Sequence, residues 1–220
     1  MFPTPSTSHV DYDQVYEPSE DSFLFLDLLQ EERSFIQERF SDSSKLGIPT
    51  VLELGLGSGI ITTFFHNYIL PQALFLGTDV NPHACKTALE TSRANNGTRY
   101  FDVLRTNIWD GLRPNTVDVL LFNPPYVPAD NLGSYESSIK SDDWLDFALL
   151  GGEDGMQVTK IVLDQLDFVM RDRGVAYILF CFRNKPEEVA KAMTDRGWSV
   201  KKIGERKIRW EILSIWRFSR

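Results

Sequence analysis

The sequence predicts an α/β fold built on a mostly parallel sheet of seven strands with helices on both faces. Short apolar runs alternate with longer helical segments from residue 51 onward, which indicates strands joined by crossover helices. A glycine-rich turn follows the first run, at 55–59, and a proline-rich tetrapeptide ends the fourth, at 123–126. Open parallel sheets bind ligands at the carboxyl ends of their strands, so both segments lie where a site is expected.

Size and charge narrow the range of functions. With 220 residues the chain suits one domain, 17–220, preceded by an N-terminal arm, 1–16. The net charge of -8 argues against sequence-independent binding to nucleic acid, which needs clustered lysine and arginine. The run Lys201-Lys202 with Arg206-Lys207 is a candidate basic patch, although a solvated strand face explains it as well.

Neither a metal centre nor a membrane segment is expected. The two cysteines and three histidines fall in no metal-ligand spacing, so we predict no metal site. No apolar run approaches the ~20 residues that span a bilayer, and the N-terminus lacks the regions of a signal peptide. We expect a protein of a reducing compartment, located in the cytoplasm, with nuclear presence left open.

The first predicted elements are the arm and one long helix. Residues 1–16 are polar and contain prolines, so we expect an extended arm with limited order. A helix over 18–40 follows, because Pro18 suits a helix start, Ser19 is a plausible cap and acidic residues favour the first turn. The polar residues 41–44 form a loop.

The remaining elements follow from apolar runs and turn signals. Pro82 lies near a helix start, Asn96-Gly97 is a turn signal, and the prolines at 124–125 end the fourth strand. We expect a long loop with short structure over 127–150. The predicted strands are 51–54, 74–79, 100–104, 117–122, 175–182, about 198–206 and 210–218, and the predicted helices are 60–69, 82–95, 156–170 and 186–196.

The glycine turn Gly55-Leu56-Gly57-Ser58-Gly59 and the acid Asp79 predict a cofactor containing adenosine. Glycines let the backbone approach a ligand closely, and a carboxylate ending the next strand can accept both ribose hydroxyls. A dinucleotide fingerprint would have its third glycine where Ile60 stands; the spacing resembles instead the turn that receives the methionine part of S-adenosylmethionine. A structural turn with a solvated aspartate is the alternative, and Asn107 either binds the adenine edge or is a simple turn residue.

The tetrapeptide Asn123-Pro124-Pro125-Tyr126 predicts the chemistry. An amide held at the end of a strand can accept a hydrogen bond from a substrate NH2 group, the Pro124 carbonyl is a second acceptor, and Tyr126 offers a flat apolar face. The alternative is a purely structural role, in which the asparagine and the prolines only lead the chain from the strand into a loop.

Together these motifs resemble the class I S-adenosylmethionine-dependent methyltransferases that modify planar NH2 groups, and within them the HemK-type glutamine methyltransferases. The similarity extends to the eukaryotic, fungal-like branch that acts on the class I translation release factor, and it covers nearly the whole chain. Four segments carry this narrower resemblance: Tyr16–Phe23, Asn123–Pro128, Ala148–Gly155, and Tyr177–Cys181 with Arg183–Pro186.

The resemblance implies a Rossmann-like fold, with an antiparallel strand at the C-terminal end of the sheet, and methylation of the glutamine of a Gly-Gly-Gln motif. Asn107 stands where the family often has Asp, and Ser22 replaces a frequent Thr. The resemblance implies that Asn123, Pro124 and Tyr126 are catalytic, and that the substrate contacts these residues and Pro125. The cofactor-binding residues that it implies are Ser22, Glu53, Gly55, Gly57, Gly59, Asp79, Asn107, Ile108 and Asn123.

Two other functions stay open, an adenine-amine methyltransferase acting on nucleic acid and a scaffold without activity. The acidic balance and the absence of a separate target-recognition domain argue against the first, and the intact tetrapeptide argues against the second.

A partner is also expected. The edge strand Tyr100–Leu104 has no Lys or Pro to block pairing, and the family pairs such an edge with a small zinc-binding activator; a loop of this chain is the alternative cover.

Overall fold

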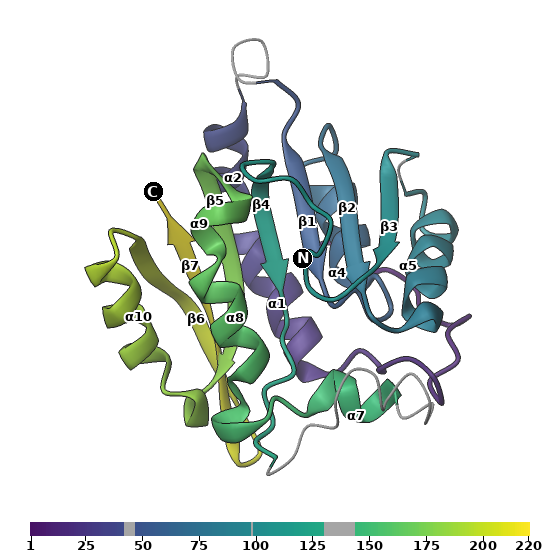
Figure 1. Cartoon of the computed structure of the whole chain (residues 1–220). Helices are drawn as coiled ribbons and strands as arrows, with labels where there is room; N and C mark the ends of the chain where they lie inside the picture. Colours follow the sequence, from purple (N-terminus) through teal and green to yellow (C-terminus); the bar gives the residue numbers. More distant parts are fainter. Residues whose placement is uncertain (42–46, 98, 130–143) are drawn as a thin grey trace.

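The computed structural model describes residues 1–41, 47–97, 99–129 and 144–220 (Figure 1). Seven strands of these described residues form one sheet, in the order β3-β2-β1-β4-β5-β7-β6. All neighbours are parallel except β7, which runs antiparallel to β5 and to β6. The predicted fold class is confirmed. The strands are β1 (Thr50–Leu54), β2 (Leu74–Asp79), β3 (Phe101–Arg105), β4 (Val117–Phe122), β5 (Met170–Cys181), β6 (Ser199–Ile208) and β7 (Glu211–Ser219).

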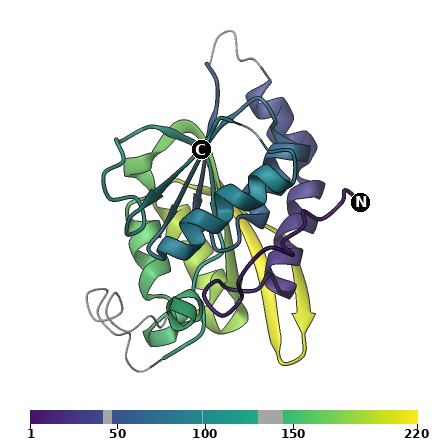
Figure 2. The same cartoon turned by 90° about the vertical axis from the view of Figure 1, so that its right-hand side faces the viewer.

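Helices cover both faces of the sheet (Figures 1 and 2). On one face lie α1 (Glu20–Glu31), α2 (Arg33–Phe40), α4 (Ile60–Phe64), the π-helical turn η1 (Phe65–Ile69) and α5 (Pro82–Ala94). On the other lie α8 (Gln157–Asp164), α9 (Leu166–Val169) and α10 (Pro186–Asp195). The remaining short helices are α7 (Trp144–Leu149), η2 (Glu153–Gly155) and η3 (Phe182–Asn184).

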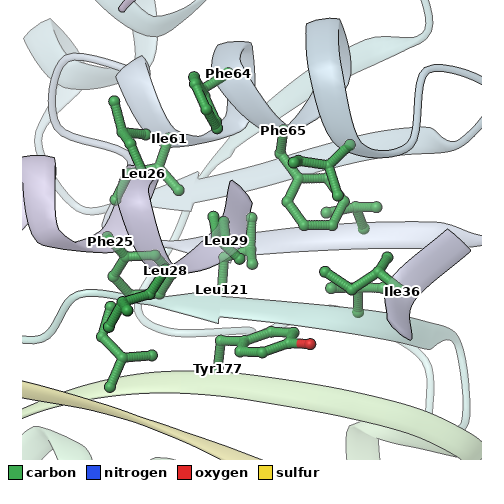
Figure 3. Packing of buried hydrophobic residues seen from close by; sticks show 14 of the residues in the cluster. Phe25, Leu26, Leu28, Leu29, Ile36, Ile61, Phe64, Phe65, Leu121 and Tyr177 are labelled. Atoms are coloured by element: carbon green, nitrogen blue, oxygen red, sulfur yellow. The ribbon is translucent and has the colours of Figure 1, made fainter. Parts of the chain in front are cut away.

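The core consists of two layers, one on each side of the sheet. All six residues of β4 are buried, and the last four alternate between the layers as the period of a strand requires. Val119 and Leu121 contact the layer under α1, while Leu120 and Phe122 contact the layer under α8. Figure 3 shows the first layer, where Leu121 lies against the aromatic and aliphatic side chains of α1 and η1. This packing fixes the end of β4, and with it the tetrapeptide that follows.

Two helix predictions differ from the structure. The helix expected over 18–40 begins at Glu20 and is interrupted at Glu32, whose buried carboxylate accepts a hydrogen bond from the Tyr177 hydroxyl at 2.9 Å. The helix expected over 156–170 is divided into α8 and α9, and β5 starts at Met170 instead of 175. The start of the strand was not predicted because Arg171 and Arg173 are polar. In the structure they belong to the strand, where each forms an ion pair with Asp118 on β4.

The N-terminal arm also differs from the expectation of limited order. Ser6 exchanges hydrogen bonds of 2.7 and 2.8 Å with the side chain of Asn95, which ends α5. The Gln14 carbonyl accepts a hydrogen bond of 2.8 Å from Asn81, which caps the other end of α5, and Val15 is buried. The composition of the arm does not predict this order, because the side chains that bond the arm belong to the residues at the two ends of α5.

The segment expected as a long loop, 127–150, is only partly described, since 130–143 lie outside the described residues. On either side of that gap, Val127 and Leu150 form a parallel bridge, and α7 precedes Leu150. Among the described helices none is long and apolar enough to span a membrane. No group of three or more acidic, histidine or cysteine side chains in the described chain is placed to hold a metal ion.

Candidate active site

A cavity of about 380 Å³ lies at the carboxyl ends of β1, β2 and β4. This volume is within the range of small-molecule and cofactor sites. The arm, α1, the glycine turn, the tetrapeptide, α7 and α8 all contribute to its walls. Every site residue predicted from the sequence lines it except Gly59; these are Ser22, Glu53, Gly55, Gly57, Asp79, Asn107, Ile108, Asn123, Pro124, Pro125 and Tyr126.

The three glycines of the turn have two different roles. All three have positive φ, between 50° and 74°, which favours glycine. A Cβ at Gly55 or Gly57 would meet no described atom within 4 Å, so these two leave the cavity wall open to a ligand. A Cβ at Gly59 would lie 2.6 Å from the Cα of Ala88, so this glycine permits α4 to pack against α5. Its predicted contact with the cofactor is therefore not supported by its position.

Two acids lie behind the glycine turn, the buried Glu53 and the half-buried Asp79. Glu53, at the end of β1, accepts hydrogen bonds from the Thr62 hydroxyl and from the Thr62 amide, the latter at 2.8 Å. Burial raises the pKa of Glu53 to about 8, and the nearby Asp79 carboxylate adds to the rise. Asp79 accepts backbone bonds from Gly57 at 3.0 Å and from Asn81 at 2.9 Å, while burial raises its pKa. Each Asp79 oxygen thus accepts one backbone bond and keeps a further lone pair for a ligand.

The loop after β3 closes the cavity near Asp79. Asn107 lies two residues beyond the end of β3, is exposed and lines the cavity. Ile108 has φ 51°, a strained conformation for a β-branched residue, and its carbonyl accepts a hydrogen bond of 2.5 Å from the Thr78 hydroxyl. Such strain persists where surrounding contacts enforce it, and here it places an apolar side chain on the cavity wall.

The tetrapeptide forms the opposite wall. The side-chain nitrogen of Asn123 donates a hydrogen bond of 3.0 Å to Asp21. Its oxygen is buried and has no hydrogen-bond partner among the described residues. The Tyr126 carbonyl accepts a bond of 3.2 Å from Asn184, which fixes the backbone beyond the prolines, and burial raises the pKa of the Tyr126 hydroxyl. The tetrapeptide, which lines the cavity, therefore holds a buried acceptor without a partner in the described part of the chain.

Comparison with known proteins places the chain in a family. Residues 36–134 match the family "Methyltransferase small domain". The chain is 33% identical to human methyltransferase HEMK2 over 227 residues, covering 100% of this chain and 97% of that protein. It is 34% identical to the eRF1 methyltransferase catalytic subunit mtq2 of Schizosaccharomyces pombe, covering 100% and 96%. The chain belongs to the HEMK2/Mtq2 family of methyltransferases. The solved Mtq2–Trm112 complex of E. cuniculi, described as responsible for methylation of the termination factor eRF1, has 26% identity and a TM-score of 0.67, covering 94% of this chain and 99% of that one.

Membership of the HEMK2/Mtq2 family agrees with the resemblance inferred from the sequence motifs. The residues present also fit S-adenosylmethionine on structural grounds. Gly55 and Gly57 leave room for the methionine part, Asp79 has acceptor capacity for the ribose hydroxyls, and Asn107 and Ile108 line the region beyond. Ser22 lies on the cavity wall nearer the tetrapeptide, bonded to Asp21.

Sequence reasoning missed many of the residues that line this site, and three of them illustrate why. Asp21 is buried and bonds the tetrapeptide, although its position in the first turn of α1 suggested only a helix-stabilising charge. The signal available was its place in a conspicuous run of acids next to Ser22. Val15 on the arm and Trp144 on α7 also line the cavity, and no local pattern distinguishes them from other apolar side chains.

Proposed function

We propose that this methyltransferase transfers a methyl group from S-adenosylmethionine to the side-chain nitrogen of the glutamine in the Gly-Gly-Gln motif of eRF1, the class I translation release factor. The relatives named as eRF1 methyltransferases support this choice of substrate, since the match covers the whole chain. The observation that carries the proposal is Asn123 on the cavity wall, whose buried oxygen has no hydrogen-bond partner among the described residues.

The chemistry of an amide explains why that oxygen matters. The nitrogen of a glutamine amide is a poor nucleophile, because its lone pair is delocalised into the carbonyl. Asn123 Oδ1 and the Pro124 carbonyl can each accept one N–H of the substrate, which favours a pyramidal nitrogen and stabilises its developing positive charge. Tyr126 offers a flat face on which the amide plane can stack. When bound, S-adenosylmethionine supplies an electrophilic methyl group on a sulfonium.

The substrate is tested by a direct comparison. The protein, produced with its activator, is incubated with radiolabelled S-adenosylmethionine and one of three acceptors: release factor with Gly-Gly-Gln, release factor with Gly-Gly-Ala, or duplex DNA. We expect label in the first acceptor alone. Label in DNA would support the adenine-amine alternative, and label in both release factors would move the modified atom away from the glutamine.

We propose that a small zinc-binding activator adds a strand to β3. Among the described strands β3 pairs only with β2, so its outer edge has no strand partner. Within β3 Phe101 is buried and Leu104 is 40% exposed, and Tyr100, which directly precedes the strand, is 63% exposed. An edge of this kind promotes aggregation unless a partner covers it, and strand addition is a common way of covering one. The relative solved as the Mtq2–Trm112 complex supports such a partner.

The activator interface is tested by charge substitution. Leu104→Lys should abolish co-purification with the activator, because a charged edge strand resists pairing. The matched control is Phe168→Lys, since Phe168 on α9 is 49% exposed but lies away from β3. Loss of the complex in both variants, or in neither, would contradict the proposed interface. The cytoplasmic location stays a prediction.

A further inference from the structure

The orientation of the Asn123 amide decides whether the site works. An asparagine carries an oxygen and an NH2 group of nearly equal size, so the side chain fits its place in either of two orientations. Only one of them turns the oxygen, an acceptor, toward the N–H groups of a substrate amide. The other would present an NH2 group, a donor facing donors. Some neighbour must therefore select the productive orientation.

Asp21 is the neighbour placed to do so. Its Oδ2 lies 3.0 Å from Asn123 Nδ2, and its Oδ1 lies 2.7 Å from the backbone nitrogen of Ser22. The Tyr16 hydroxyl lies 3.3 Å from both oxygens. A carboxylate only accepts hydrogen bonds, so all three neighbours must donate to it. Asn123, which lines the cavity, then has to turn its NH2 group toward Asp21, and its buried oxygen is left without a partner among the described residues.

We propose that Asp21 is a positioning residue, which sets the acceptor side of Asn123 toward the substrate amide. The inference rests on the proposed function, because that function defines the group that Asn123 meets. A capping role at the start of α1 would account for the bond to Ser22. It would not account for the bond that joins Asp21 to a residue 102 positions away.

The substitution Asp21→Asn tests the orientation directly. The Ser22 amide still needs an oxygen on its side, so the new NH2 group faces the NH2 group of Asn123. The Asn123 amide relieves this conflict by turning over, which puts a donor into the cavity. We expect kcat on release factor to fall about 10²-fold, the size of losing one preorganised polar group. Calorimetry should show the affinity for S-adenosylmethionine changed by less than threefold.

A second substitution should restore the acceptor. In the double variant Asp21→Asn, Asn123→Asp, the introduced carboxylate accepts from the introduced amide and turns its other oxygen toward the cavity. We expect this variant to have a kcat at least tenfold higher than that of Asp21→Asn alone. Asn123→Asp alone should be impaired, because two carboxylates then stand in contact. A role limited to helix capping predicts no rescue, since position 123 takes no part in the cap.

The matched control is Asp27→Asn, which makes the same chemical change on the same helix. Asp27 pairs with Arg206 at 2.6 Å outside the cavity, so its loss should leave kcat within twofold. The inference would be overturned if Asp21→Asn kept full activity. It would also be overturned if the fall in kcat of the double variant equalled the product of the falls in the two single variants. Absence of methylation by the wild-type complex would instead overturn the proposed function. The side-chain amide resonances of Asn123 provide a readout apart from activity and should shift in Asp21→Asn but not in Asp27→Asn.

Discussion

The two ends of β4 carry buried polar side chains with opposite bonding. At the amino end, Asp118 is fully buried and accepts hydrogen bonds from Arg173 at 2.6 Å, Arg171 at 2.8 Å and the Thr50 backbone at 2.9 Å. At the carboxyl end, Asn123 bonds through its nitrogen alone, and its buried oxygen has no partner in the described chain. The strand between them is uniformly buried.

This difference separates a stabilising group from a reacting one. A buried polar atom without a partner lowers the free energy of unfolding by about 1–3 kcal/mol, so it persists where it serves another purpose. Asp118 has its partners within the chain and joins β4 to β1 and β5. The open acceptor of Asn123 needs its partner from outside. We therefore expect substitutions at the two ends to affect different properties.

The largest effect is expected at the amino end, on stability. Asp118→Ala leaves the partly buried Arg173 without its counter-ion, and breaking such a buried pair costs about 3–5 kcal/mol. Urea unfolding should show this loss, while cofactor affinity of the remaining folded protein should change little. A variant as stable as wild type would contradict the structural role assigned to Asp118.

At the carboxyl end the effect is expected on rate. Asn123→Ala should lower kcat by roughly 10²–10³-fold, by analogy with the loss of one preorganised donor or acceptor. Stability and affinity for S-adenosylmethionine should remain near wild type, because no protein group loses its only partner. Near-normal methylation by this variant would remove Asn123 from the chemistry and break the comparison between the two ends.

The sequence alone predicted the reacting end better than the stabilising end. Asn123 and the glycines stand beside prolines or in a recognisable spacing, so local patterns reveal them. Asp118 lies inside an apolar run, and its partners Arg171 and Arg173 lie more than 50 positions away. These ion pairs also explain why the start of β5 was predicted too late. A polar segment is interpreted as a loop when the sequence does not show the buried acid with which it pairs.

Contacts between distant segments account for the other differences. Asp21 reads as a helix-start acid until Asn123 is brought beside it, and the order of the arm depends on asparagines at the two ends of α5. Gly59 is the converse case, since its motif spacing suggested a ligand contact and the structure shows in addition that close helix packing requires the glycine. Motifs thus indicate where chemistry occurs, but packing decides which members of a motif touch the ligand.

An intermediate case at the end of β2 sharpens the comparison. Each oxygen of Asp79 accepts one backbone bond and retains acceptor capacity for ribose hydroxyls. Asp79→Ala should weaken binding of S-adenosylmethionine about 10–10²-fold, the range for hydrogen bonds to a charged group. Calorimetry measures this, with Asp27→Asn, which lies outside the cavity, as the control that keeps its affinity. Unchanged affinity would remove Asp79 from the cofactor site.

The effect expected at Glu53 depends on pH. Its pKa of about 8 in the folded protein exceeds the ordinary value of 4.5, so the native state holds a proton that the unfolded state has already released. The free energy of unfolding should therefore fall as pH rises from about 4.5 to about 8, and the full penalty applies above that. Glu53→Gln keeps an oxygen for the Thr62 donors but cannot ionise, so it escapes this fall.

In thermal unfolding without cofactor, the Tm of Glu53→Gln minus the Tm of the wild type should therefore increase between pH 5 and pH 8. The direction follows from burial, which disfavours the charged carboxylate. Asp79→Asn is the companion variant, because removing its charge should narrow the gap between the two Tm profiles by lowering the pKa of Glu53. Parallel profiles across this range would mean that Glu53 ionises in the folded protein as it does in water. Glu53 would then resemble Asp118, an acid whose hydrogen bonds compensate for its burial.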